Sequence, residues 1–394
     1  MRMLGAHRSV IRELFEYGKK RKAEIGADRV FDFSLGNPSV PAPDIVNGEI
    51  KRLIDTENSL SLHGYTSAQG DAGVREAIAN YINGRYSEQI TPDCIYMTVG
   101  AAAALTSALT AVVTEGEEVI VPAPYFPEYK VFIERHGAKI RPVKSDESTF
   151  MLDLSAIEAA INEKTAAIII NSPNNPTGVV YSEENISALA TLLKKKESEL
   201  SRPIYLISDE PYRELVFGGI SVPYLTKYYD DTIVCYSFSK SLSLPGDRIG
   251  YVLVCPRMEG FTEVYQAVCG AARALGFVCA PSLFQKILPA CLGTTADVAI
   301  YDKNRTLLLE SLSEYGFTLV RPDGAFYLFI KSPTGNATEL CERAKRFEIL
   351  IVPSDDFGCP GYARLAYCVR TEEILSALVA FKALADSYKS EGIL

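Results

Sequence analysis

Short apolar runs alternate with helical patterns through the middle of the chain. Seven runs are rich in Ile, Val and Tyr, and several lack polar alternation, which is typical of strands covered on both faces. They are Cys94–Gly100, Glu118–Pro122, Lys139–Lys144, Ala166–Asn171, Ile204–Asp209, Ile233–Phe238 and Ile249–Cys255. Helical patterns lie between them at Ala101–Val113, Pro127–His136, Leu154–Ile161 and Glu183–Lys195. This order predicts a doubly wound α/β domain whose mostly parallel seven-stranded sheet lies between helices.

The two ends of the chain predict a second, α+β module. Runs at Phe317–Val320 and Ala325–Ile330 flank a turn and predict a hairpin, followed by a helix over 337–347, strands near 349–352 and 363–368, and a helix from Thr371. A single core stops growing near ~250–300 residues, so two domains fit a chain of 394 residues. We expect a large domain at 46–285 and a small domain at 1–45 and 286–394. An N-terminal helix should pack on the small domain, and a long helix after Pro281 should join the two.

Charge and composition exclude several classes of protein. A net charge of −9 would repel phosphate backbones, so we expect no nucleic acid partner. Nine cysteines occur without a CxxC pair, which is typical of reduced intracellular thiols. No apolar run approaches the ~18 residues of a membrane span, and the charged beginning of the chain lacks the apolar stretch of a signal peptide. We therefore expect a cytoplasmic protein without a membrane partner.

The sequence offers few histidines for catalysis or metal binding. The three histidines, His7, His63 and His136, are isolated from one another and from cysteine clusters. A histidine-based metal site or a Ser-His-Asp triad needs such side chains in combination. We expect no metal site, and the chemistry must rest mainly on other groups.

A lysine with unusual neighbours follows the predicted strand Ile233–Phe238. The stretch SFSKSLSLPGDRIG places Lys240 among hydroxyl side chains, with Arg248 a short distance further on. A lysine is rarely buried unless it is functional or paired, and a solvated lysine at a strand end is the simpler alternative. An amine that can form an imine, two hydroxyls and a planar guanidinium suited to phosphate make an uncommon combination. This stretch is therefore a candidate site.

Three other stretches follow predicted strands. In SDEPY, Asp209 lies at the carboxyl end of a buried strand, where ligands of open α/β sheets bind, although a helix-capping acid is the alternative. In NNPTG, turn chemistry explains the proline and glycine better than the consecutive asparagines, either of which could donate to a ligand. At Gly100, small residues open a helix and would let an anion approach its free N–H groups, although close packing explains them equally well.

Taken together, the stretches SFSKSLSLPGDRIG, SDEPY, NNPTG and GYTSAQGDAGVREAIA resemble the class I aminotransferases. These form the aspartate aminotransferase family of fold-type-I pyridoxal-phosphate enzymes, and the resemblance runs from about Phe31 to the final helix. It implies pyridoxal 5′-phosphate as cofactor and a ping-pong exchange of an amino group between an L-amino acid and a 2-oxo acid such as 2-oxoglutarate. It also implies a homodimer whose active sites are shared across the interface.

The resemblance assigns roles around the cofactor ring. Lys240 matches the lysine that holds the cofactor covalently and moves the substrate proton. A free lysine with a pKa near ~10.4 is a poor base, and burial beside Arg248 would lower that pKa. Asp209 matches the partner of the pyridine nitrogen, and Tyr212 and Asn175 match the pair that hydrogen-bonds the phenolic oxygen. Tyr125 matches the aromatic residue that stacks on the ring.

The resemblance also assigns the phosphate and substrate contacts. The phosphate contacts are Gly100, Ala101, Ala102, Ser237, Ser239, Arg248 and, from the neighbouring subunit, Tyr65. The substrate α-carboxylate contacts are a bidentate clamp from Arg364 and the backbone of Gly36, with Asn175 and Tyr125 close by.

One departure concerns the substrate. Some relatives carry a lysine at the position of Ala102 that binds the distal carboxylate of aspartate, and alanine cannot do this. Others use an arginine of the partner chain in the region that holds Arg273 here, although the spacing differs. Arg273 is therefore a candidate for binding the distal carboxylate of an aspartate-like amino donor. The alternative is that Arg273 is a helix arginine that faces solvent.

Three rival functions differ in how well they fit. A carbon–sulfur β-lyase on the same fold would use the same cofactor residues, so the sequence discriminates poorly against it. A regulatory protein with this fold would carry a DNA-binding segment, and the resemblance leaves no room for one. A generic nucleotide-binding module would need a phosphate-loop fingerprint, which is absent from this sequence.

Overall fold

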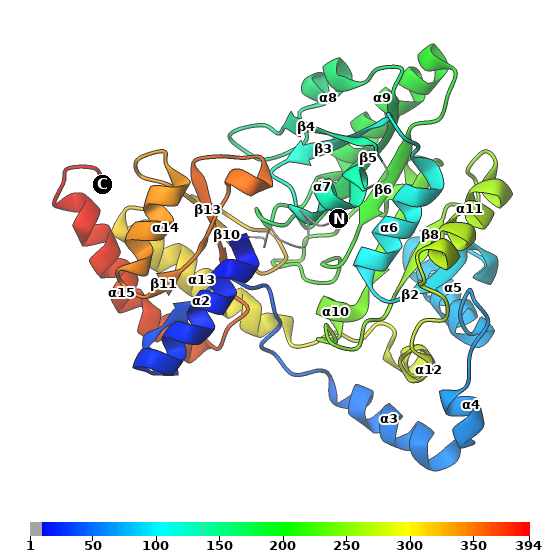
Figure 1. Ribbon diagram of the computed structural model, residues 1–394, viewed down its shortest axis with the longest axis horizontal. Coiled ribbons are helices and arrows are strands. Elements are labelled where there is room, and N and C mark those ends of the chain that lie inside the picture. The colour runs from blue at the N-terminus through cyan, green and yellow to red at the C-terminus, as the bar shows by residue number, and fades with distance from the viewer. Residues whose placement is uncertain (1–9, 136) are drawn as a thin grey trace.

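The computed structural model describes residues 10–135 and 137–394 of the chain. The first nine residues of the expected small domain and the last residue of the expected helix Pro127–His136 lie outside this description. Figure 1 shows two lobes, a large one that carries the central part of the chain and a small one that carries both ends of the described part, at residues 10 and 394. None of the described helices is both long and apolar enough to cross a membrane.

The large lobe is built on a seven-stranded sheet with the order β2-β8-β7-β6-β5-β3-β4. The strands are β2 Ile95–Thr98, β3 Glu118–Ala123, β4 Lys139–Lys144, β5 Thr165–Asn171, β6 Tyr205–Asp209, β7 Thr232–Ser237 and β8 Gly250–Val254. Strand β8 runs antiparallel to β2 and β7, whereas the pairs from β7 to β4 are parallel. The expected mostly parallel sheet is confirmed.

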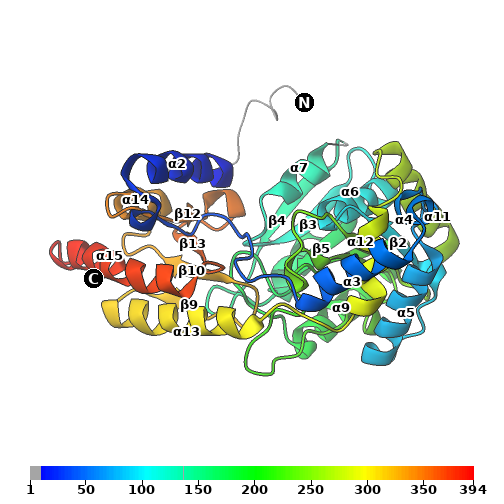
Figure 2. The ribbon, with the colours of Figure 1, turned by 90° about the horizontal axis from the view of Figure 1, so that it is seen from below.

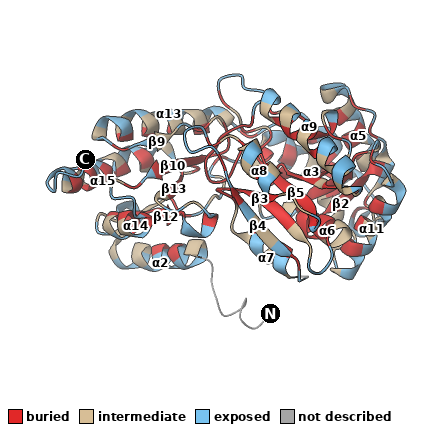
Figure 3. Cartoon of the chain, turned by 90° about the horizontal axis from the view of Figure 1, so that it is seen from above, coloured by how far each residue is buried: buried red, intermediate tan, exposed pale blue. Residues whose placement is uncertain are grey.

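Helices cover both faces of this sheet (Figure 2). One face packs on α6 Ala101–Val112, α7 Glu128–Glu134 and α11 Phe261–Ala274. The other packs on α5 Ala72–Tyr86, α8 Leu154–Ala160, α9 Glu183–Leu200 and α12 Ser282–Cys291. Within β5, Ala167 and Ile169 face the first layer while Ile168 and Ile170 face the second, so the middle of the strand is apolar on both faces. Figure 3 shows the resulting concentration of buried residues in the strands.

The small lobe combines an antiparallel sheet with helices from both ends of the chain. Its sheet has the order β12-β13-β10-β9, and a separate parallel pair joins β1 to β11. The strands are β1 Phe31–Asp32, β9 Leu319–Val320, β10 Tyr327–Lys331, β11 Ile349–Leu350, β12 Val352–Pro353 and β13 Tyr362–Ala366. The helices are α2 Val10–Ile25, α13 Val298–Tyr315, α14 Ala337–Lys345 and α15 Thr371–Lys389. The expected hairpin is the pair β9–β10, and α2 packs on β11 and β12 as expected of an N-terminal helix.

The connection between the lobes differs from the expected single long helix. Helix α12 ends at Cys291, and α13 begins only at Val298. Gly293 between them has a φ of +82°, a left-handed conformation that ends a helix, and the side chain of Asp297 caps the start of α13. Residues of α12 such as Ile287 pack in the core of the large lobe, so the expected boundary after residue 285 falls inside this helix.

Two short helices, α3 Asp44–Thr56 and α4 Ser59–His63, extend from the lower edge of the large lobe in Figure 1. They expose large apolar side chains to an unusual degree, with Ile54 57% and Leu60 86% accessible. Exposed apolar side chains that gather in one region mark interaction surfaces. Short helix α10 Phe238–Ser241, which follows β7 directly, points instead toward the space between the lobes.

Candidate active site

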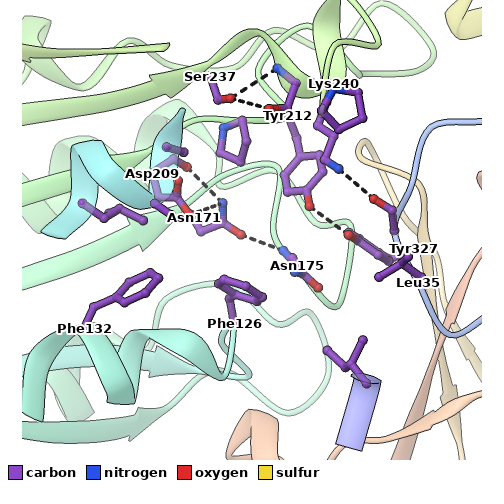
Figure 4. A pocket seen from close by; sticks show the side chains of 18 of the residues that line it. Leu35, Phe126, Phe132, Asn171, Asn175, Asp209, Tyr212, Ser237, Lys240 and Tyr327 are labelled. Carbon is purple, nitrogen blue, oxygen red and sulfur yellow. Dashed lines mark hydrogen bonds between the residues drawn. The ribbon is translucent and has the colours of Figure 1, made fainter. Parts of the chain in front are cut away.

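A cavity of about 290 Å³ lies between the lobes, at the carboxyl ends of β5, β6 and β7. This is where ligands of open α/β sheets bind. Residues expected in the site that line the cavity are Gly36, Ala101, Ala102, Asn175, Asp209, Tyr212, Ser237, Ser239, Lys240, Arg248 and Arg364. Figure 4 shows side chains of the large lobe, among them Asp209, Tyr212 and Lys240, together with Tyr327 of the small lobe.

Lys240 enters the cavity from the single turn of α10. The hydroxyl of Ser237 accepts a hydrogen bond from the backbone N–H of Ser239 at 3.2 Å, which caps this turn and fixes its direction. The amine Nζ donates to the carbonyl oxygen of Gly36 at 2.7 Å. Burial lowers the pKa of Lys240 to about 8, and the charges of Arg248 and Arg364 contribute in the same direction. About a tenth of this amine is therefore neutral at pH 7, far more than for a lysine with the ordinary pKa of 10.5.

Asp209 lies at the end of β6 and is buried. Its Oδ2 accepts a hydrogen bond from the hydroxyl of Tyr129 at 2.5 Å, and the amide of Asn171 donates to its backbone oxygen at 3.0 Å. The other carboxylate oxygen, Oδ1, is buried without a hydrogen-bond partner within the described residues. Burial raises the pKa of Asp209 to about 7, although the hydrogen bond from Tyr129 opposes this change. A cation or an N–H donor at Oδ1 would favour the charged form.

Tyr212 and Arg364 connect the two lobes across the cavity. The hydroxyl of Tyr212 shares a hydrogen bond of 2.8 Å with that of Tyr327 on β10, so the position of Tyr212 is set by the small lobe. Arg364 is 1% exposed, and its two terminal nitrogens donate to Oδ1 of Asn175 at 3.1 Å and to the carbonyl of Ser34 at 2.6 Å. This network holds the guanidinium at the wall of the cavity.

The start of helix α6 forms the other end of the cavity. Gly100 has a φ of +88°, and a Cβ at this position would lie 2.8 Å from Nη2 of Arg248. The guanidinium therefore lies against the helix N-terminus, where free N–H groups and the helix dipole both favour an anion. The hydroxyls of Ser237 and Ser239, 2.7 Å apart, line the same end.

The expected aromatic residue requires a correction. Tyr125 does not line the cavity, because its ring packs against Gly358, where an added Cβ would lie 2.7 Å from Cε1 of the ring. Its backbone N–H also donates to the carbonyl of Phe357 at 3.0 Å. The next residue, Phe126, lines the cavity instead and faces the region of Asp209 and Asn175 in Figure 4.

Two other expected residues lie outside the cavity of their own chain. Tyr65 follows α4 and is 97% exposed, and Arg273 lies in the exposed last turn of α11. The loop after α11 contacts the residue next to Tyr65, because Sγ of Cys279 lies 3.4 Å from the carbonyl oxygen of Thr66. The structure of a single chain therefore brings neither side chain to Lys240.

Sequence reasoning missed several residues that shape the site. Tyr129 and Asn171 hold Asp209, Tyr327 holds Tyr212, and Leu35 lines the cavity as an apolar side chain. The position of Asn171 at a strand end, like that of Asp209, was a usable signal. No local pattern marked the two tyrosines, since their partners lie 80 and 115 residues away in the chain.

Comparison with known proteins identifies the class to which this fold and site belong. The family profile described as aminotransferase class I and II matches residues 28–381. The chain belongs to this family and is a pyridoxal-phosphate-dependent transaminase. The resemblance noted in the sequence is thereby confirmed.

Individual relatives agree with this assignment. The chain is 32% identical over 374 residues to the aspartate aminotransferase of Thermotoga maritima, which covers 93% of this chain and 95% of the relative. It is 32% identical over 360 residues to a probable aspartate/prephenate aminotransferase of Thermus aquaticus, with 88% and 89% covered. A crystal structure of an aminotransferase from Eubacterium rectale superposes with a TM-score of 0.96 at 53% identity over 98% of both chains.

Proposed function

We propose that the chain binds pyridoxal 5′-phosphate through Lys240 and transfers an amino group between an L-amino acid, with an aspartate-like donor favoured, and a 2-oxo acid such as 2-oxoglutarate. The observation that carries this proposal is the juxtaposition in one cavity of two groups. One is the amine of Lys240, whose pKa is lowered to about 8, and the other is the carboxylate of Asp209, one oxygen of which is buried without a hydrogen-bond partner among the described residues.

The residues present fit a phosphorylated pyridine ring. Oδ1 of Asp209, which has no partner among the described residues, suits a protonated ring nitrogen, because that nitrogen is a hydrogen-bond donor of opposite charge. The absence of a side chain at Gly100 leaves room for an anion beside Arg248 and the start of α6. The apolar ring of Phe126 offers a face for stacking between these two ends.

Pyridoxal phosphate, when bound, supplies an aldehyde carbon that exchanges amines and a ring that accepts the electron pair left when the substrate Cα loses its proton. Lys240 would be the base for this step. Its Nζ would accept the proton from the substrate Cα, hold it, and donate it at the former aldehyde carbon. Its lowered pKa suits this role, because a base works best with a pKa near the operating pH.

Asp209, Tyr212 and Asn175 would hold the ring. Asp209 would keep a proton on the ring nitrogen, because a cationic donor at its unpaired Oδ1 adds to the hydrogen bond from Tyr129 in stabilising the buried charge. Tyr212 and Asn175 would contact the phenolic oxygen of the ring, and the hydrogen bond shared by Tyr212 and Tyr327 and the bond from Arg364 to Asn175 fix their orientation. Preorganised donors of this kind need not rearrange during the reaction.

Arg364 is the proposed clamp for the substrate α-carboxylate. A guanidinium binds a carboxylate through two parallel hydrogen bonds, and a buried position strengthens both. Its Nε is buried without a hydrogen-bond partner within the described residues, and one donor is therefore available. Leu35 and Phe126 narrow the cavity beside it and would exclude water from the bound substrate.

The acidic donor and the homodimer are proposed together. Among the described residues the cations that line the cavity are Lys240, Arg248 and Arg364, so a distal carboxylate needs a cation from a second copy. Tyr65 is exposed just after α4, which also exposes Leu60, and Arg273 is exposed near the end of α11, so we propose that a two-fold partner receives both side chains. Two relatives at 32% identity are named for aspartate, which agrees with this choice.

Two experiments test the proposal. Borohydride reduction of the purified protein should fix the cofactor to the peptide that contains Lys240, and a labelled peptide from elsewhere would contradict the assignment. A panel of amino donors with 2-oxoglutarate should then show amino transfer that is fastest with aspartate or a similar acid. Release of pyruvate and ammonia from cystathionine without any 2-oxo acid would instead favour the β-lyase.

A further inference from the structure

A tight turn after β4 presents a phenylalanine to the small lobe. The carboxylate of Asp146 accepts hydrogen bonds from the backbone N–H groups of Ser148 and Thr149 at 3.0 and 2.8 Å and from both hydroxyls. The backbone N–H of Phe150 donates to the carbonyl of Asp146 at 2.8 Å, and Asp146 donates to the carbonyl of Met151 at 3.0 Å. These bonds hold the turn in one conformation.

Phe150 itself has an unusual backbone. Its φ is +58°, in the left-handed region that a bulky side chain rarely adopts, yet the residue is only 6% exposed. A glycine would adopt this conformation freely, so a phenylalanine here carries backbone strain that the surrounding hydrogen bonds maintain. A strained backbone is retained where the direction of the side chain matters.

The ring of Phe150 contacts two rings of the small lobe. It meets Phe329 of β10 edge-on, with centroids 5.8 Å apart at 83°, and Tyr362 of β13 in the same way at 5.5 Å and 87°. Phe329 and Tyr362 stack on each other with centroids 4.7 Å apart at 5°. Clefts of about 430 and 330 Å³ open on the two sides of Phe150, so this contact is a local bridge between the lobes.

This bridge lies on the face of the sheet that carries Arg364. Phe329 and Arg364 are direct partners in the antiparallel pair β10–β13, so their side chains point to the same face. Tyr362 precedes Arg364 by two residues and shares that face as well. The guanidinium of Arg364 continues the row, because it lies 4.7 Å from the ring centre of Tyr327. Phe150 thus packs on the side chains beside the arginine.

We propose that Phe150 is a positioning residue for substrate binding. It holds the Arg364 face of the small-lobe sheet at a fixed distance from the large lobe, where Lys240 and Asp209 lie. The inference rests on the proposed role of Arg364 as the carboxylate clamp, and it assigns to the strained turn a part in the affinity for the carboxylate of the amino acid.

The test uses the holoenzyme and the single half-reaction with aspartate. Rapid mixing gives the aspartate concentration for half-saturation and, separately, the limiting rate. For Phe150→Ala we expect the half-saturating concentration to rise about three- to tenfold, the scale of one or two aromatic pairs. The limiting rate should stay within about twofold, and cofactor affinity, measured by titration of the cofactor-free protein, should not change, because Phe150 contacts neither reacting group.

Companion variants separate the ring from the backbone and from general stability. Phe150→Tyr keeps the ring and should behave like the wild type, and Phe150→Leu serves if the alanine variant does not fold. Phe150→Gly relaxes the strained φ but lacks the ring, so it should lose affinity as the alanine variant does. Wild-type affinity in Phe150→Gly, or a lower melting temperature with unchanged half-saturation in all variants, would overturn the proposal.

A double-mutant cycle with Arg364→Lys tests whether Phe150 acts through the arginine. Coupled residues are non-additive, so the effect of Phe150→Ala should shrink at least about twofold in the Arg364→Lys background. Independent, multiplying effects would overturn the positioning role while leaving the carboxylate clamp intact. If Arg364→Lys alone leaves half-saturation unchanged, the clamp itself is wrong and the role of Phe150 falls with it.

Discussion

The hydroxyl of Tyr129 donates to Oδ2 of Asp209 at 2.5 Å. This bond fixes the carboxylate of Asp209 and leaves Oδ1 as its buried oxygen without a partner within the described residues. Tyr129 comes from α7 on one face of the sheet, whereas Asp209 ends β6 in the sheet itself. A helix of the covering layer therefore orients the acid that is proposed to hold the ring nitrogen.

Tyr129→Phe should weaken cofactor binding and turnover without disrupting the fold. The phenylalanine keeps the packing but removes a hydrogen bond to a charged group, which is worth ~1.5–3 kcal/mol, or about ten- to a hundredfold in affinity. Fluorescence titration of the cofactor-free protein measures the affinity. The matched control is Tyr229→Phe, which removes another buried hydroxyl, bonded to the carbonyl of Ile204 at 2.8 Å. Equal losses in both variants would contradict a specific role for Tyr129.

Asp209→Asn should stabilise the cofactor-free protein at neutral pH. The folded pKa of Asp209, about 7, is raised above its ordinary value of 3.8. The stability that this group contributes is therefore fully present below pH 3.8 and is lost as the pH rises through 7. The asparagine variant, which has no charge to bury, should gain ~2–4 kcal/mol relative to the wild type between pH 5 and 8. Urea unfolding measures this difference, and a gain independent of pH would refute the shifted pKa.

Covalent incorporation of the cofactor should depend on the protonation of Lys240. Only the neutral amine attacks an aldehyde, and burial lowers the pKa of this amine from 10.5 to about 8. The rate at which cofactor-free protein takes up pyridoxal phosphate should therefore rise with pH around a midpoint of about 8. Absorbance follows the reaction, and Lys240→Ala should show no borohydride-fixed product. A midpoint near the ordinary value of 10.5 would show that the amine is not buried in the cofactor-free protein.

Mixed dimers should reveal whether Tyr65 serves the partner's site. Tyr65 is 97% exposed and lies outside the cavity of its own chain. A Lys240→Ala subunit paired with a Tyr65→Ala subunit forms one doubly damaged site and one intact site if Tyr65 crosses the interface. Activity should then rise above that of both parents on mixing. Activity that stays at the mean of the parents, in mixtures shown to contain mixed dimers, would mean that the sites are not shared.

Arg273→Leu tests the acidic donor. A bidentate arginine–carboxylate contact in a closed site is worth ~1.5–3 kcal/mol, or about ten- to a hundredfold in selectivity. Catalytic efficiency, kcat/KM, should fall by that factor for aspartate and stay nearly unchanged for alanine or phenylalanine. Equal losses for all donors, or no loss for aspartate, would refute the assignment. A broad neutral or aromatic specificity would then be favoured, in agreement with the apolar contribution of Leu35 and Phe126 to the cavity.

The local pattern of the sequence predicts much of this fold because buried strands have a strong signature. The expected strand at Lys139–Lys144 has the observed bounds of β4, and the other six central strands differ from expectation by one or two residues at either end. The antiparallel direction of β8 was not predicted, because a buried apolar run is the same in either direction. The break after α12 depends on the conformation of Gly293, which an apolar pattern does not report.

The site was predictable only as far as it depends on motifs. Lys240 and Asp209 were identified beside predicted strands and Arg364 by the family resemblance, and the structure brings all three to one cavity. Tyr125 was expected at the face of the ring, whereas Phe126 lines the cavity. Adjacent aromatic residues fit the same motif, and the packing of Tyr125 against Gly358 is not visible in a local pattern. Contacts between distant segments, such as that of Tyr129 with Asp209, leave no trace in a local pattern.

The small lobe has a consequence for how the chain folds during synthesis. Its parallel pair joins Phe31 to Ile349, and Phe33 packs on Phe381 with ring centroids 5.8 Å apart. The seven central strands lie between residues 95 and 254 and can assemble before those partners have left the ribosome. Until Leu350 and Val352 have been synthesised, the apolar face of α2, which carries Leu14, cannot pack against them. A nascent chain of this protein therefore exposes the apolar face of α2 until residues 349–352 have been synthesised.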